Sequence, residues 1–93
     1  MPALSRQETE KLAKDSGDWM LSSENISLTK RFDLGSFNAA LEFFNEIGRL
    51  ALEQKIFPDL NLREHIVEVK LDAAGPSLSR SDFSLAEKIN RLF

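Results

Sequence analysis

The chain has 93 residues, and its 12 lysines and arginines against 15 aspartates and glutamates give a formal charge of −3. This acidic balance argues against a dedicated nucleic-acid binder, which needs a basic face to contact phosphates. The absence of cysteine excludes disulfides, thiolate metal sites and a cysteine nucleophile. A hydrophobic content of 42% at this length indicates one small globular domain, residues 1–93, with a modest core.

No stretch of the sequence approaches the roughly 18 consecutive apolar residues of a membrane-spanning helix. The first residues also lack the apolar segment of a signal peptide. We therefore expect a cytoplasmic protein that makes no membrane contact.

Local signals at the start of the chain predict a helix followed by two strands. Ser5 to Glu8 form a capping box, which predicts a short polar helix that ends near Lys14. Residues 19–21 and 26–32 then have the composition of strands. Alternating apolar and polar residues in the second of these strands indicate half-buried antiparallel pairing.

The longest predicted helix begins at Phe37, where Ser36 is placed to cap it, and ends before Pro58. Its apolar residues recur at helical spacing and predict a core-facing stripe of Ala40, Leu41, Phe44, Ile47, Gly48 and Ala51. Three more apolar residues widen the surface beyond this stripe, namely Phe43, Leu50 and Leu52. This surplus predicts a second packing surface, such as a subunit contact.

Residues 62–71 predict one long strand, with Val67, Val69 and Leu71 on its core face. After a loop, Ser79 to Asp82 form a second capping box that starts a final helix. The predicted order is α-β-β-α-β-α. Such an order indicates the α+β class, with an antiparallel sheet and helices packed on one of its faces.

The stretch from Phe32 to Ala86 resembles the pterin-4a-carbinolamine dehydratases. The main helix matches the spacing of that family at Phe37, Asn38, Ala40, Phe43, Phe44, Ile47, Gly48 and Ala51. Without a gap the same frame reaches Pro58, which matches the proline after the paired histidines of the family. The resemblance implies dimers formed by joining sheets edge to edge, with further pairing available through the main helix.

The sequence departs from this family at its histidines. Active members carry His-His-Pro, then a tryptophan, and a third histidine in the loop before the last helix. Here Ile56 and Phe57 precede Pro58, and Leu60 stands at the tryptophan position. The third histidine is replaced by an alanine at one of two positions, Ala73 or Ala74.

These replacements remove the groups that dehydration of a carbinolamine requires. One proton must reach the leaving hydroxyl and another must leave the ring nitrogen, and imidazoles accelerate such steps by roughly 10²–10⁴-fold. We therefore predict that the chain is not an enzyme and needs no cofactor. Ala73, Ala74 and Asp82 would then mark a degenerate pocket, although Asp82 has a sufficient role in its capping box.

His65 is the single histidine of the sequence. We expect it in the middle of the long strand, on the core side, in a structural role. It would lie roughly 25 Å of strand away from Ala73, too far to replace the lost imidazoles. One histidine cannot form a zinc site, which needs about three or four ligands, so no metal is expected.

Two interpretations of Ile56 and Phe57 remain open. They can fold inward and fill the vanished pocket, or form with Pro58 and Leu60 an exposed contact for a protein partner. Full burial of one such side chain contributes about 1.5–3 kcal/mol, which is enough for an interface anchor.

The leading functional hypothesis is a catalytically inactive assembly factor. The degenerate pocket resembles that of dehydratase-like proteins associated with α-carboxysomes, which implies a Rubisco chaperone acting on the large subunit. The alternatives are a divergent but active dehydratase, or a pterin-binding or dimerisation module for another protein. A homo-oligomer, in the simplest case a dimer, is expected in each case.

Overall fold

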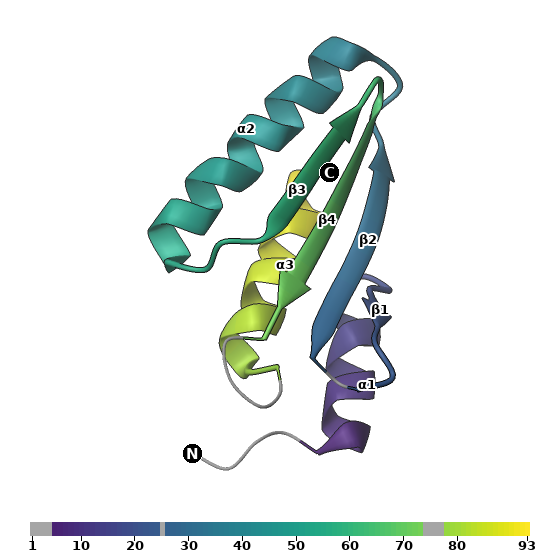
Figure 1. Cartoon of the computed structure of the whole chain (residues 1–93), viewed down its shortest axis with the longest axis vertical. Coiled ribbons are helices and arrows are strands. Elements are labelled where there is room, and N and C mark those ends of the chain that lie inside the picture. Colours follow the sequence, from purple (N-terminus) through teal and green to yellow (C-terminus); the bar gives the residue numbers. More distant parts are fainter. Residues whose placement is uncertain (1–4, 25, 74–77) are drawn as a thin grey trace.

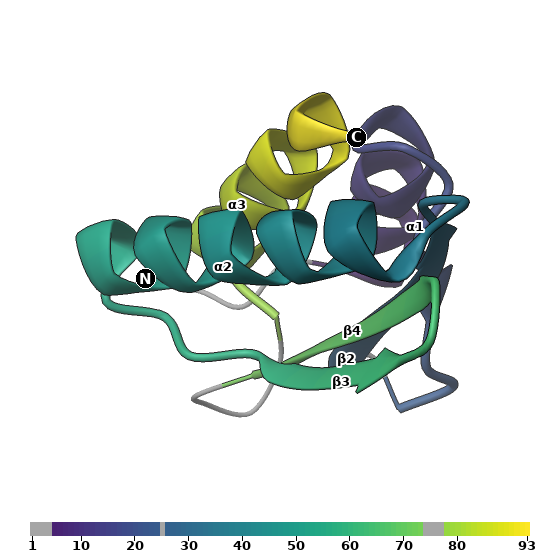
Figure 2. The same cartoon turned by 90° about the horizontal axis from the view of Figure 1, so that it is seen from above.

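A computed structural model of the chain describes residues 5–24, 26–73 and 78–93. The elements formed by these residues are α1 Arg6–Asp15, β1 Met20–Leu21, β2 Ser27–Asp33, α2 Phe37–Gln54, β3 Asp59–Arg63, β4 Ile66–Asp72 and α3 Arg80–Leu92. The strands form one antiparallel sheet, and the helices lie together on one of its faces (Figures 1 and 2). The predicted α+β class and one-sided packing are confirmed.

The order of the strands across the sheet is β1-β2-β4-β3, so that β3 is an edge strand. The prediction of one long strand over residues 62–71 was wrong, because the chain reverses at Glu64 and His65 between β3 and β4. Glu64 adopts the left-handed conformation, with φ 54°. Turns of this kind favour Gly, Asn or Asp, and without one of these the reversal is hard to recognise in the sequence.

The core lies between the sheet and the helices. On the sheet it is built from the inward-facing side chains of β2 and β4, which include the predicted Val67, Val69 and Leu71. Phe32 lies at its centre, with its ring centroid 5.9 Å from Trp19 and 4.8 Å from Phe43. The helices contribute buried apolar residues, among them Ile47, Phe83, Leu85 and Ile89.

The buried stripe of α2 is rotated from the predicted one and consists of Ala40, Phe43, Ile47 and Ala51. Phe43 is therefore a core residue rather than part of a second surface, because it packs against Phe32. Leu50 also packs against the core. Leu52 is exposed, as the prediction of a second packing surface requires. Leu41, expected in the core, is partly exposed.

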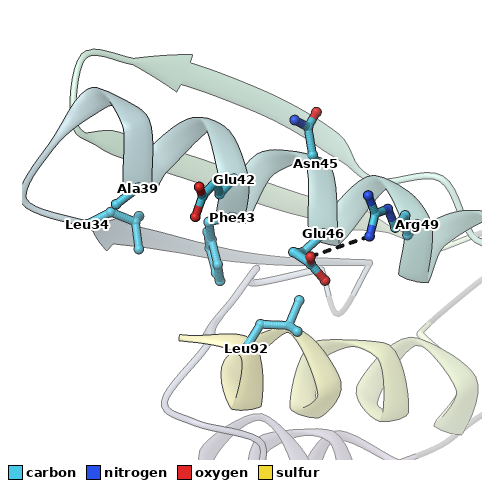
Figure 3. A pocket seen from close by; sticks show the side chains of 8 residues that line it. All are labelled: Leu34, Ala39, Glu42, Phe43, Asn45, Glu46, Arg49 and Leu92. Atoms are coloured by element: carbon cyan, nitrogen blue, oxygen red, sulfur yellow. Dashed lines mark ion pairs between the residues drawn. The ribbon is translucent and has the colours of Figure 1, made fainter.

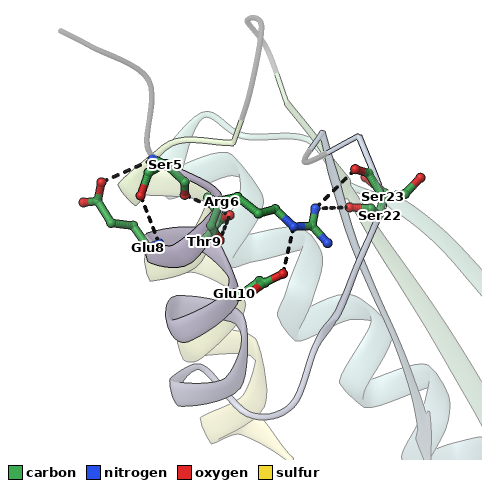
Figure 4. A network of polar contacts seen from close by, with 7 residues as sticks. All are labelled: Ser5, Arg6, Glu8, Thr9, Glu10, Ser22 and Ser23. Atoms are coloured by element: carbon green, nitrogen blue, oxygen red, sulfur yellow. Dashed lines mark hydrogen bonds and ion pairs between the residues drawn. The ribbon is translucent and has the colours of Figure 1, made fainter.

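Side-chain caps fix the start of the helices as predicted. At α1 the backbone amide of Glu8 donates to Ser5 Oγ at 3.2 Å, and the amide of Ser5 donates to Glu8 Oε1 at 3.2 Å (Figure 4). The hydrogen bonds that the backbone amide and then the side chain of Ser5 make to the Glu8 carboxylate lower the pKa of Glu8. Arg6 also donates to the carbonyl of Ser22 at 2.8 Å, and so joins α1 to the β1–β2 hairpin.

Lys30 shares the inward-facing side of β2 with Leu28 and Phe32, where an apolar residue would be ordinary. Its ammonium group donates to the carbonyl of Gly17 and to Asn90 Oδ1, and it lies 5.1 Å from the centroid of the Phe32 ring. The ammonium group thereby joins the end of α1, β2 and α3, three segments that are far apart in the sequence.

None of the helices formed by the described residues is long and apolar enough to cross a membrane.

Candidate functional site

The segment predicted to bind a protein partner begins where α2 ends. Lys55 adopts the left-handed conformation, and the amide of Ile56 donates to the carbonyl of Ala51 at 3.2 Å. This turn directs Ile56 against the core and leaves Phe57 71% exposed. Each of the two interpretations therefore fits one residue of the pair. Ile56 folds inward against the core, and Phe57 faces solvent.

Pro58 and Leu60 connect this segment to the sheet. Pro58 is half-buried, and Leu60 packs against the core beside its strand partner Val69. Of the four residues predicted to bind a partner, Phe57 is thus the one that offers a largely exposed apolar side chain.

The predicted degenerate pocket is only partly described by the structure. Ala73 packs against the core, and its amide donates to the carbonyl of Ile26 at 2.7 Å. Ala74 lies outside the described residues. Asp82 is buried, and its Oδ2 accepts from the amide of Ser79 at 2.9 Å and from Ser79 Oγ at 3.2 Å. The contact with the Ser79 amide is the one that a capping box requires of Asp82.

A band of apolar residues runs along the outer side of α2 at helical spacing. This outer stripe consists of Phe37, Leu41, Phe44, Gly48 and Leu52, of which Phe44 also packs against the core as predicted. Leu52 is 70% exposed and Phe37 is 55% exposed. A Cβ atom placed on Gly48 would meet no other atom within 4 Å, so the stripe is open at its centre. The predicted stripe omitted Phe37 and placed Leu41 in the core, although both are exposed. The helical spacing of Phe37, Leu41 and Leu52 is the signal that could have identified the outer stripe.

The other flank of α2 faces α3 across a groove of about 310 Å³ (Figure 3). Its apolar lining comes from Leu34, Phe43 and Leu92. Glu46 and Arg49 form an ion pair of 3.6 Å on its wall. Since this groove and the outer stripe lie on opposite flanks of the buried stripe, the outer stripe lies on the flank toward edge strand β3.

His65 lies in the β3–β4 turn, and the prediction that it occupies the middle of a strand on the core side was wrong. Its Nδ1 is 2.8 Å from Asp33 Oδ1, which also accepts from the amide of Gly35 at 3.0 Å. The hydrogen bond with His65, followed by that from Gly35, lowers the pKa of Asp33.

A search of the described residues finds no group of three or more His, Cys, Asp or Glu side chains that could hold a metal ion.

Comparisons with known proteins assign the family. The model of the family "Pterin 4 alpha carbinolamine dehydratase" matches residues 2–92, and the chain belongs to this family. A protein of Rubrobacter xylanophilus named "Putative pterin-4-alpha-carbinolamine dehydratase" is 34% identical over 97 residues, which cover 99% of this chain and 86% of that protein.

Two solved structures share the fold. A transcriptional coactivator/pterin dehydratase from Brucella melitensis superposes with a TM-score of 0.88 at 18% identity, covering 98% of each chain. A pterin dehydratase-like protein identified as a RuBisCO assembly factor in the alpha-carboxysome superposes with a TM-score of 0.72 at 27% identity. That match covers 80% of this chain and 87% of the other.

These comparisons correct the prediction that the chain is not an enzyme. Its relatives, from Rubrobacter and from three further bacteria, are named as dehydratases, so the chain falls within an enzyme family. Ile56 and Phe57 show only that residues 56 and 57 supply no imidazole.

Proposed function

We propose that the chain is an assembly factor for Rubisco in α-carboxysomes and that it binds the large subunit through an apolar surface. The observation that carries this proposal is the exposure of Phe57, beside the end of α2, together with the outer stripe. The 27% identity to an assembly factor of the same fold supports the choice of client.

The energy of such a contact is sufficient for specific binding. Contiguous apolar surface on a monomer marks an interaction site, and burial of one large side chain contributes about 1.5–3 kcal/mol. Phe57 and Leu52 are both largely exposed and can each act as an anchor in a partner pocket.

The edge strand β3 supports a homodimer as the form that acts. Its sequence Asp-Leu-Asn-Leu-Arg is self-complementary when two copies pair antiparallel about Asn61. Asp59 then lies opposite Arg63 of the second copy, and Leu60 lies opposite Leu62. Because the outer stripe lies on the same flank of the domain, pairing through β3 places the two stripes on one side of the joined sheet.

Co-expression with the Rubisco subunits of an α-carboxysome tests the proposal. We expect a higher yield of assembled holoenzyme and co-purification of the large subunit with this chain. Phe57→Ser and Leu52→Ser should both abolish the gain. Met20→Ser is the matched control, because Met20 is 74% exposed but lies on the opposite edge strand. An unchanged yield without co-purification contradicts the proposal.

Dehydration of a pterin carbinolamine is a second candidate function, favoured by membership of the dehydratase family. An assay of quinonoid dihydropterin formation with the purified chain tests it, and the blank rate without protein is the reference.

A further inference from the structure

The groove between α2 and α3 has an apolar floor that extends to the end of α3. Leu34, Phe43 and Leu92 form this floor, and Leu92 points from α3 toward α2 (Figure 3). Leu92 is 39% exposed and the next residue, Phe93, is 64% exposed. The ring centroid of Phe93 lies 6.1 Å from that of Phe43. Apolar side chains that remain exposed beside an apolar groove mark an interaction surface.

The α2 wall of this groove carries a carboxylate without an ionic partner. Glu42, Glu46 and Arg49 line this wall. Arg49 pairs with Glu46 at 3.6 Å, so these two charges offset each other. None of the ion pairs among the described residues includes Glu42. Glu42 therefore gives the wall a net negative charge beside the apolar floor, on a chain whose formal charge is −3.

The shape of the groove suits side chains of a protein partner better than a small molecule. Its volume of about 310 Å³ lies at the lower end of the roughly 300–1,000 Å³ of small-molecule sites, which enclose most of their ligand. This groove is instead open to solvent along α2. Its lining on α2 runs from Ala39 to Arg49, which is about 15 Å of helix and matches roughly three turns of a second helix.

The walls of the groove also determine the secondary structure that a partner can adopt. Both walls are helices, whose backbone groups pair within α2 and within α3. A partner in an extended conformation would find no strand edge there and would leave its own backbone groups unpaired. A helix pairs its backbone groups internally and presents apolar side chains at intervals of three and four residues.

We propose that this groove is the docking site for an amphipathic helix of a protein partner, in which a lysine or arginine lies one turn from an apolar anchor. The anchor fills the floor between Phe43 and Leu92, and the basic side chain pairs with Glu42. A carboxylate on the rim of an apolar groove selects partners by charge and speeds their approach. Because the outer stripe lies on the opposite flank of α2, the two surfaces can be tested separately.

Titration of the ¹⁵N-labelled chain with two synthetic peptides tests the site. Both peptides have about 15 residues, enough to form a helix on binding, with leucines at intervals of three and four residues. One peptide carries lysines one turn from the leucines, and the matched peptide carries glutamates there. We expect saturable shifts at Leu34, Ala39 and Leu92, and roughly tenfold tighter binding of the lysine peptide. Absence of saturable shifts, or shifts confined to the outer stripe, overturns the site.

Two pairs of variants separate the groove from the rest of α2 and α3. Leu92→Ser should weaken binding of the lysine peptide roughly tenfold, whereas Leu52→Ser, in the outer stripe, should not. Glu42→Gln should remove the preference for lysine over glutamate. Glu53→Gln removes the same charge from α2 outside the groove and should keep this preference. A preference that survives Glu42→Gln, or that both variants lose equally, overturns the recognition of charge. The ¹⁵N spectrum of each variant reports whether it is folded.

Dilution of the chain without peptide distinguishes a foreign partner from a second copy of this chain. We expect the resonances of Leu34 and Leu92 to be independent of the chain concentration. Shifts of these resonances on dilution would show that copies of the chain dock in the groove, and would overturn the proposal of a foreign helix.

Discussion

The two ends of strand β3 differ in chemistry. At the α2 end, Ile56 and Phe57 provide apolar surface, one side chain inside the domain and the other outside. At the opposite end, the β3–β4 turn places His65 Nδ1 2.8 Å from Asp33 Oδ1. The absence of an imidazole at residues 56 and 57 therefore concerns one end of β3, and the one histidine of the chain lies at the other end.

The largest expected effect is a difference in stability between alanine substitutions at Ile56 and at Phe57. Ile56→Ala should lower the free energy of unfolding by about 2 kcal/mol, because it removes packing against the core. Phe57→Ala should change it by less than about 0.5 kcal/mol, as expected for an exposed side chain. Chemical denaturation measures both. Equal losses would show that Phe57 is structural and would remove the main support for a partner contact.

The next effect concerns the charged residues of β3, Asp59 and Arg63, in the proposed dimer. Arg63→Asp should weaken the proposed dimer roughly tenfold, because each of its two Asp59–Arg63 pairs becomes a repulsive pair. Exchange of both charges, Asp59→Arg with Arg63→Asp, should restore it. Sedimentation equilibrium measures the dissociation constants. A dimer that is insensitive to both changes cannot pair through β3.

A substitution at Gly48 in the outer stripe tests whether a partner covers this face of α2. Gly48→Ala should raise the free energy of unfolding by about 0.5–1 kcal/mol, since the added methyl group meets no other atom. The same substitution should weaken binding of the large subunit if the partner approaches the helix backbone closely there. Thermal unfolding and a pull-down measure the two effects, and a loss of stability would contradict the open environment of Gly48.

The smallest effect is a dependence of stability on pH at the His65 end. The pKa of Asp33 is lowered in the folded state by its hydrogen bonds with His65 and Gly35. Its contribution is therefore present above the pKa of the unfolded chain and is lost as the pH falls toward the folded value. Unfolding curves across the acid range should show a shallower loss in Asp33→Asn. The pKa of Glu8 is also lowered, and its contribution to the pH dependence is the same in the native chain and in Asp33→Asn.

Much of the fold could be predicted from short local patterns in the sequence. The caps at Ser5, Ser36 and Ser79 start the helices as predicted, since each is set by residues within one turn. The rotation of α2 could not be predicted, because Phe43 and Phe44 are adjacent and equally apolar. Contact with Phe32, which is distant in sequence, decides that Phe43 faces the core.

The candidate sites were predictable to different degrees. The sequence placed Ile56 and Phe57 just after the main helix, but only packing separates the buried side chain from the exposed one. The β3–β4 turn left a weak signal, because Leu60 and Leu62 have even numbers whereas the buried residues of β4 have odd ones. This change of parity marks a break in a strand, and it would have placed His65 in a turn.

The edge position of β3 has a consequence for how far assembly can proceed. A row of free backbone groups invites open-ended growth of a sheet unless something terminates it. The opposite edge of this sheet is β1, which has two residues and offers too short a row to receive another copy. Addition of a second chain at β3 would occupy the long edge that the described part of each chain offers. The pair would then close on itself about a two-fold axis instead of seeding a fibre.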